Sequence, residues 1–404
     1  MKRISFSPPR VDQEIIDEVV DALKSGWITT GPKTKALEKE IVKMTNSRAC
    51  LCVNSATAGM ELMLRWFGVQ AGDEVIVPAF TYCSTANVVV HLGAKPVMVD
   101  INEDDLCINL DQVEEAINEK TKAIIGVDLA GLPAQMDQIM RLAEQKASLF
   151  NPNNPNQVQM GRMLVMTDAA HSLGARLNHQ PAVLSSDAAV YSFHAVKNLT
   201  TAEGGAINLN LPDTFSVEDV YAYLNMLSLH GQSKDALAKF GKGSWEYDVL
   251  EAGYKCNMPD VLAAMGLVEI KRYEQDTLVK RQSLFERYMQ GLAGTPGLTL
   301  PVMKTASRIG SYHLFLLRLA TGDRSKRDRI IDLMNDRGVS LNVHYKPLPL
   351  LSIYKRMGYD IDAYPVSKDQ FDRVISLPLF YDLELSGVDY ICENLKEVLE
   401  VVGI

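Results

Sequence analysis

Apolar residues follow two patterns along the chain, and the patterns alternate. From Asp12 to Lys24 they recur at helical spacing before Gly26, which predicts an amphipathic opening helix. Short apolar runs rich in β-branched residues follow, separated by helical segments such as 58–67 and 84–91, at 50–53, 74–77, 96–99, 123–128, 163–167, 188–193 and 205–209. These runs do not alternate with polar residues, which is typical of strands buried on both faces. We therefore predict an α/β fold with a mostly parallel central sheet covered by helices.

The pattern changes in two places. Between 144 and 162 it gives way to the stretch Asn151-Pro152-Asn153-Asn154-Pro155-Asn156-Gln157, which predicts a surface loop inserted before a core strand. After about residue 264 the pattern predicts a long helix at 267–292, short apolar segments at 299–302 and 312–319, and helices at 325–337 and 388–401. This order indicates a smaller α+β domain, so we expect a large domain over 1–265 and a small domain over 266–404.

Composition narrows the class of protein. A chain of 404 residues with a 47% hydrophobic content is long enough for two domains in one soluble enzyme. The net charge of −9 argues against a nucleic-acid partner, because no segment supplies the clustered Lys and Arg that phosphate binding needs. No signal-like or membrane-length apolar run is present, so we expect a cytoplasmic protein without a membrane partner. The six scattered cysteines favour buried free thiols, and we expect no metal.

The strongest chemical signal combines Lys197 with Asp168. A lysine that forms an imine with an aldehyde cofactor must lose its proton, which is easiest in a tight, partly desolvated loop. Lys197 follows a buried strand in such a segment. An aspartate upstream could keep the ring nitrogen of pyridoxal phosphate protonated, so that the cofactor draws electrons from a substrate carbon. Taken alone, a lysine is usually a solvated surface charge, and Asp168 could simply cap a helix.

The surrounding residues carry a family resemblance. The segment from Ser192 to Gly205, SFHAVKNLTTAEGG, resembles the Schiff-base segment of the DegT/StrS type of nucleotide-sugar aminotransferases, S-F-H-x-x-K-x-x-T-x-x-E-G-G. The segment from Asp168 to His171 is similar to the D-A-A-H segment of that family, and the resemblance runs from about Gly26 to the C-terminus. It implies a fold type I transferase that depends on pyridoxal 5'-phosphate (PLP), cycling with its pyridoxamine form, with Lys197, Asp168 and His171 as catalytic residues.

The resemblance also assigns cofactor-binding residues. A small-residue segment between a strand and a helix holds Ser55, Ala56 and Thr57, where a helix N-terminus can bind an anion, and this matches the cradle of the cofactor phosphate. An ordinary N-cap turn is the alternative. Ser192 is implied as a further phosphate donor. Tyr82 corresponds to the aromatic residue that stacks on the cofactor, although a half-buried core tyrosine is the structural alternative.

Three further segments have weaker assignments. Asn257, in a segment similar to the family's G-Y-K-x-N-M, implies a contact with the phosphate of a neighbouring subunit and thus a homodimer with shared active sites. Its alternative role is to cap a helix that begins near Pro259. The resemblance implies that Thr30, Gly31, His344 and Tyr345 line the side of the active site that binds the sugar nucleotide. The alternative is that the turns rich in Gly and Pro only connect helices and strands.

We therefore expect an aminotransferase that moves the amino group of glutamate to a keto-sugar nucleotide in two half-reactions, for amino-sugar, surface polysaccharide or lipopolysaccharide biosynthesis. The resemblance favours C4 of a UDP- or dTDP-linked sugar over C3. Asp128 departs from the family, because many members carry histidine there. A dehydratase of this fold typically has histidine in place of Lys197. A non-catalytic sugar-nucleotide-binding regulator remains the alternative from another class, and no G-x-G-x-x-G or P-loop motif supports another nucleotide enzyme.

Overall fold

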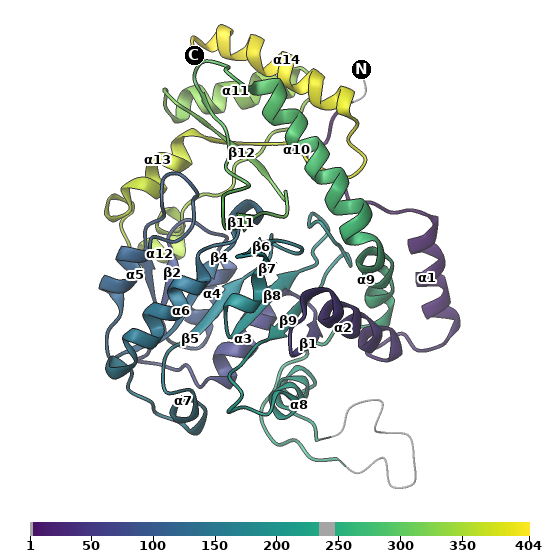
Figure 1. Cartoon of the computed structure of the whole chain (residues 1–404), viewed down its shortest axis with the longest axis vertical. Coiled ribbons are helices and arrows are strands. Elements are labelled where there is room, and N and C mark those ends of the chain that lie inside the picture. The colour runs from purple at the N-terminus through teal and green to yellow at the C-terminus, as the bar shows by residue number, and fades with distance from the viewer. Residues whose placement is uncertain (1–2, 234–246) are drawn as a thin grey trace.

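The computed structural model describes residues 3–233 and 247–404 and contains a central seven-stranded sheet (Figure 1). The strand order is β1-β9-β8-β5-β4-β2-β3, and only β9 runs antiparallel to its neighbours. The strands are β1 (Ala49–Val53), β2 (Glu74–Pro78), β3 (Lys95–Val99), β4 (Thr121–Val127), β5 (Leu164–Asp168), β8 (Ala188–Ser192) and β9 (Gly205–Leu209). The predicted α/β fold with a mostly parallel sheet is confirmed.

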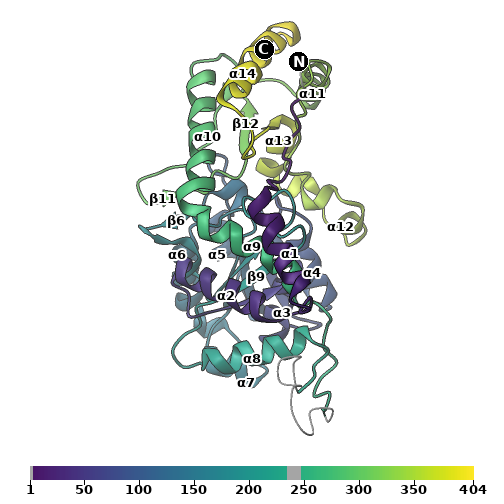
Figure 2. The same cartoon turned by 90° about the vertical axis from the view of Figure 1, so that its right-hand side faces the viewer.

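Both faces of this sheet are buried, as the apolar runs predicted. Alternate residues of β1 belong to different hydrophobic clusters, with Leu51 and Val53 in one and Cys50 and Cys52 in the other. Figures 1 and 2 show helices on either side of the strands. The helices of this part are α1 (Gln13–Lys24), α2 (Pro32–Thr45), α3 (Ala56–Trp66), α4 (Ser84–His91), α5 (Leu110–Ala116), α6 (Met136–Gln145), α7 (Pro155–Met160), α8 (Val217–Ser228) and α9 (Asp260–Arg272).

A second core surrounds a three-stranded sheet near the C-terminus. Its strands lie in the order β10 (Leu298–Thr299), β12 (Phe315–Leu319) and β13 (Val374–Leu377), and all pairs are antiparallel. The helices of this part are α10 (Leu278–Leu292), α11 (Arg324–Asp336), α12 (Ser352–Arg356), α13 (Pro365–Arg373) and α14 (Leu385–Val402). A third small sheet joins β6 (Arg176–Leu177), β7 (Gln180–Pro181) and β11 (Arg308–Ile309).

Two predictions in the C-terminal part need correction. The helix expected at 267–292 is two helices, because α9 begins at Asp260 and a π turn at Tyr273–Thr277 separates it from α10. The run at 299–302 adds only Thr299 to a strand, since Pro301 has no backbone N–H for pairing. The boundary at 265/266 falls inside α9, and the division of the chain into domains 1–265 and 266–404 stays a prediction.

The loop expected within 144–162 is partly wrong, because it contains α7. Asn154 caps this helix by accepting a hydrogen bond from the Gln157 N–H at 3.1 Å, and Pro155 occupies its first position, where no N–H is needed. The helix ends at Gly161, whose φ is +69°. Gln157 is buried and donates to the Phe67 carbonyl at 2.9 Å, so the segment packs against the end of α3.

The structure also bears on membrane-spanning helices and on the cysteines. Among the described residues, no helix is both long enough and apolar enough to cross a membrane. All six cysteines are free thiols, and all except Cys83 are buried. The part of the chain that the structure describes also contains five short 3-10 turns: Leu129–Gly131, Ala147–Leu149, Ala182–Ser185, Leu348–Leu350 and Ile361–Ala363.

Candidate active site

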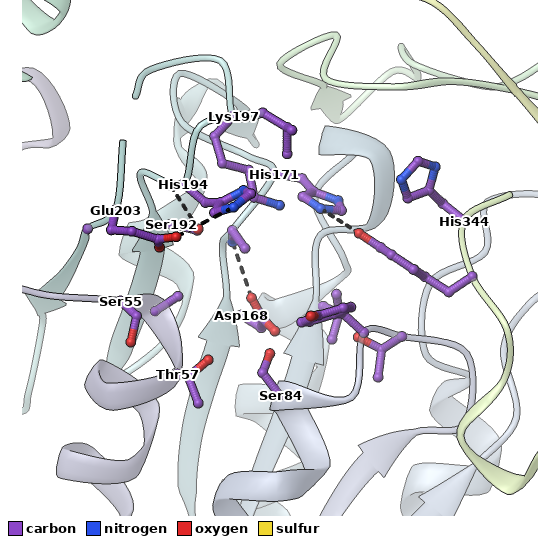
Figure 3. A pocket seen from close by; sticks show the side chains of 18 residues that line it. Ser55, Thr57, Ser84, Asp168, His171, Ser192, His194, Lys197, Glu203 and His344 are labelled. Carbon is purple, nitrogen blue, oxygen red and sulfur yellow. Dashed lines mark hydrogen bonds and ion pairs between the residues drawn. The ribbon is translucent and has the colours of Figure 1, made fainter. Parts of the chain in front are cut away.

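A cavity of about 440 Å³ opens at the carboxyl ends of the parallel strands (Figure 3). This edge is where open α/β sheets place their sites, because loops and helix N-termini converge there. Ten of the residues singled out from the sequence line the cavity: Ser55, Ala56, Thr57, Tyr82, Asp168, His171, Ser192, Lys197, His344 and Tyr345. Residues from the N-terminal, central and C-terminal parts of the chain therefore meet in one space.

Asp168 is the last residue of β5 and is buried beneath the cavity. Its Oδ2 accepts a hydrogen bond from the Thr85 hydroxyl at 2.8 Å, and its Oδ1 accepts one from the Ala170 N–H at 3.2 Å. Burial raises the pKa of this carboxyl group, which these hydrogen bonds oppose. No helix follows Asp168, so the alternative role as a helix cap is wrong. The carboxylate is instead held in one orientation facing the cavity.

Lys197 lies in the loop between β8 and β9, and its backbone N–H donates to the His194 carbonyl at 2.9 Å. Figure 3 shows Lys197 and Asp168 approaching the cavity from different sides. Burial lowers the pKa of the amine to about 8, although the charge of Asp168 acts in the opposite direction. The cavity is therefore lined both by an amine that loses its proton readily and by a fixed carboxylate.

His171 links the cavity to the C-terminal part of the chain. Its Nδ1 accepts the Ala130 N–H at 3.2 Å, and its Nε2 lies 3.1 Å from the Tyr345 hydroxyl. Burial holds the pKa of His171 well below its usual range, so the ring is neutral. Because Nδ1 accepts, the ring proton is on Nε2 and is donated to Tyr345. The Tyr345 hydroxyl is then free to donate its own proton into the cavity. The neighbouring His344 contacts the Ser376 hydroxyl at 2.8 Å.

The N-terminus of α3 lines another side of the cavity, where it could bind an anion. Ser55 is the N-cap and accepts the Ala58 N–H at 3.1 Å, so the predicted cap turn is present. The N–H groups of Ala56 and Thr57 belong to the first helical turn and have no partner within the helix. Gly205 allows β9 to approach closely, since a Cβ there would lie 2.6 Å from the Ala56 nitrogen.

These groups fit pyridoxal phosphate, the cofactor that the resemblance implies. The α3 N-terminus would hold the phosphate, Asp168 the ring nitrogen and Lys197 the aldehyde carbon. Tyr82 is 58% exposed, so the alternative of a core tyrosine is wrong and its ring is available to a flat ligand. Its centroid lies 5.8 Å from that of Tyr345. Among the described residues, no group of His, Cys, Asp and Glu could hold a metal ion.

Three predicted site residues lie outside the cavity. Asn257 Nδ2 donates to the Thr30 hydroxyl at 2.6 Å, and that hydroxyl donates to the Met258 carbonyl at 2.6 Å. The Gly31 N–H donates to Asp260 Oδ1 at 2.8 Å. Asn257 makes no capping bond to α9, so that alternative is wrong. The roles of Thr30, Gly31 and Asn257 in binding stay predictions.

The structure adds residues that the sequence analysis did not single out. Thr81, Ser84 and Glu203 line the cavity, and Thr85 orients Asp168. Glu203 stands in the matched motif, whereas the sequence gives no signal for the three hydroxyl residues. Thr85, in α4, meets Asp168 at the end of β5 only in the folded chain. Asp128 is buried at the end of β4, and its Oδ1 accepts the Ala134 N–H at 2.8 Å. Burial raises the pKa of Asp128 to about 7.

Comparisons with known proteins agree with this geometry. The model of the DegT/DnrJ/EryC1/StrS aminotransferase family matches residues 9–396. A putative sugar aminotransferase from Streptococcus pneumoniae, solved in its PMP form, is 45% identical with a TM-score of 0.95, covering 99% of this chain and 100% of that one. The same protein is also solved in its PLP form.

More distant relatives share the whole length. The spore coat polysaccharide biosynthesis protein SpsC of Bacillus subtilis is 33% identical over 401 residues, which is 98% of this chain and 97% of that protein. Helicobacter pylori PseC, an aminotransferase involved in the biosynthesis of pseudoaminic acid, is 25% identical with a TM-score of 0.87, over 99% of this chain and 100% of that chain. The chain belongs to the DegT/DnrJ/EryC1/StrS aminotransferase family and is a PLP-dependent transaminase.

Proposed function

We propose that this protein transfers the amino group of glutamate to a keto-sugar nucleotide, with Lys197 as the reacting amine. The observation that carries the proposal is the single cavity in which Lys197, Asp168 and the N-terminus of α3 meet. When bound, pyridoxal phosphate supplies an aldehyde that reacts with amines and a ring that withdraws electrons from the adjoining carbon. The chain then has to hold the ring, keep its nitrogen protonated and move protons.

Lys197 is suited to moving the proton. With a pKa of about 8, roughly a quarter of the amine is neutral at pH 7.5. An ordinary lysine with a pKa of about 10.4 would be neutral in roughly one molecule in 800 at that pH. Burial therefore raises the reactive fraction about 200-fold. Asp168 complements this base, because its carboxylate is fixed by Thr85 and Ala170 and can retain a proton on the ring nitrogen.

The sugar substrate is proposed from the relatives and from polar groups on the C-terminal side of the cavity. The similar proteins include a putative sugar aminotransferase and a polysaccharide biosynthesis protein. Tyr345, held by His171, offers a hydroxyl donor to an oxygen of a keto-sugar, and His344 lies beside it. A 4-keto sugar linked to UDP or dTDP is preferred to a 3-keto sugar on the family resemblance. We also propose a cytoplasmic homodimer in which Asn257 serves the neighbouring active site.

Spectroscopy tests the proposal directly. The purified protein reconstituted with PLP should absorb in the visible, lose that band when glutamate is added, and regain it with the correct keto-sugar nucleotide. Lys197→Ala should lose this response while still binding the cofactor through the α3 N-terminus. A wild-type protein that stays unresponsive to PLP and glutamate but binds UDP or dTDP would support the non-catalytic regulator instead. Analysis of products from a panel of 4-keto and 3-keto sugars then assigns the position.

A further inference from the structure

The side chain of Asn198, directly after Lys197, is fully committed to hydrogen bonds with the C-terminal part of the chain. Its Nδ2 donates to the Ser311 carbonyl at 2.9 Å and to the Tyr273 hydroxyl at 3.2 Å. Its Oδ1 lies 2.8 Å from Nδ1 of His313. Because the amide nitrogen faces a carbonyl, the oxygen faces the histidine, and His313 must be the donor.

The partners of Asn198 are themselves fixed. The backbone N–H groups of Ser311 and His313 donate to the Gly131 and Ala130 carbonyls at 3.0 and 3.1 Å. The buried Arg281 donates to the His313 carbonyl at 2.6 Å. The segment 311–313 lies between β11 and β12 and is therefore anchored both to the 3-10 turn Leu129–Gly131 after β4 and to α10. The segment 311–313 therefore holds the side chain of Asn198 in a fixed position.

The same segment reaches His171. The Ser311 hydroxyl donates to the His171 carbonyl, and the rings of His171 and His313 have centroids 4.3 Å apart. Burial and the neighbouring His171 hold the pKa of His313 well below its usual range, so the ring stays neutral. The segment 311–313 thus holds the chain both at Asn198 and at His171, on two sides of the cavity. Neither Asn198 nor His313 lines the cavity, so they do not touch a bound substrate.

Fixing the backbone beside Lys197 has a kinetic consequence. The side chain of Lys197 has a fixed length, so the place of its backbone sets which points in the cavity its amine can reach. Displacement of a reacting group by about 1 Å can lower a rate by roughly 100-fold. The amine must reach the aldehyde carbon in one stage and a carbon-bound proton in another. Its attachment point must therefore hold a defined place relative to the cavity.

We propose that Asn198 and His313 are positioning residues for Lys197, and that the hydrogen bond from His313 Nδ1 to Asn198 Oδ1 fastens the lysine loop to the segment 311–313. This inference rests on the proposed function, because it takes Lys197 as the reacting amine. It assigns a functional role to a contact between residues 115 positions apart. Neither residue contacts the cofactor site directly.

Three variants of His313 distinguish the loss of this hydrogen bond from a general loss of packing. His313→Phe keeps a ring but has no donor, so Asn198 Oδ1 is left unpaired. His313→Asn places an amide nitrogen on the same Cγ position and should restore the bond. His313→Gln places that nitrogen one carbon further away and should fail. We expect kcat of the Phe and Gln variants to fall about 10- to 100-fold with KM for glutamate within about 3-fold, and the Asn variant to stay within about 5-fold of wild type.

A second measurement does not depend on catalysis. In the cofactor-free protein, the pH dependence of Lys197 labelling by trinitrobenzenesulfonate, followed by peptide mass spectrometry, reports the pKa of the amine. The wild-type midpoint should lie near the pKa of about 8. In the Phe and Gln variants a loosened, better solvated amine should titrate about one pH unit higher or more, whereas the Asn variant should match wild type.

Tyr288→Phe is the matched control. Its buried hydroxyl donates to the Pro378 carbonyl at 2.7 Å in the C-terminal core, so its loss should lower the melting temperature without moving the Lys197 midpoint or kcat. The proposal is overturned if His313→Phe and His313→Gln behave like this control, or if His313→Asn is as impaired as they are. If wild-type Lys197 titrates near 8 but glutamate never reacts, the proposed function fails and the positioning role is judged by the midpoints alone. A variant that does not fold leaves the other two to decide.

Discussion

The hydroxyl of Thr85 donates to Asp168 Oδ2 at 2.8 Å, and Thr85→Val removes it with little change in volume. Thr85 is fully buried and the valine fills its place, so water has no room at the position of the lost donor. A hydrogen bond to a charged group contributes about 1.5 to 3 kcal/mol. For a chain of 404 residues that unfolds as one unit, this corresponds to a fall in melting temperature of roughly 2 to 4 °C.

The effect should depend on pH. Burial already raises the folded-state pKa of Asp168 above its ordinary value, and loss of the Thr85 donor should raise it further. When the folded-state pKa of a carboxyl group is raised, the free energy of unfolding of the protein falls as pH rises from the unfolded-state pKa to the folded-state pKa. The variant should therefore lose more stability at pH 8 than in acid below the folded-state pKa of Asp168, because the lost donor stabilises the charged form.

Thr167→Val is the control for this prediction. Thr167 is buried next to Asp168, but its hydroxyl donates at 2.8 Å to the neutral Ser186 hydroxyl. Its loss should cost only about 0.5 to 1.5 kcal/mol at every pH. Scanning calorimetry of the cofactor-free variants at several pH values makes the comparison. Equal losses in both variants, with no pH dependence for Thr85→Val, would show that Thr85 does not stabilise a charged Asp168.

Three other predictions concern the cavity. Tyr345→Phe removes a neutral hydroxyl donor, so kcat/KM for the keto-sugar should fall roughly 2- to 12-fold while the affinity for PLP is unchanged, as steady-state kinetics and absorbance titration would show. Gly205→Ala places a methyl group 2.6 Å from the Ala56 nitrogen and should weaken PLP binding at least about 10-fold. Gly161→Ala, which is strained by its φ of +69° but does not line the cavity, should lower stability and leave the Kd unchanged. The labelling rate of Lys197 in the cofactor-free protein should rise about tenfold per pH unit up to a pH of about 8 and then level; a rise that continues to pH 10 would refute the lowered pKa.

The residues that line the cavity were partly predictable from the sequence, because the candidate reactive groups stand in contiguous segments. Lys197 and Ser192 share one motif, and Asp168 and His171 share another. The partners that tune them were not predictable. Thr85 lies 83 positions from Asp168, and His313 lies 115 positions from Asn198, so nothing in the local sequence relates them.

The amino-acid sequence by itself determined the layered α/β architecture and singled out Lys197 and Asp168 as the candidate amine and carboxylate. Short apolar runs rich in β-branched residues favour strands buried on both faces, and that preference is local to each run. Tertiary structure alone decided where helices break, as at Tyr273–Thr277, and which residues orient the site. Those outcomes depend on packing and hydrogen bonds between segments far apart in the chain, which exist only after the two cores have formed against each other.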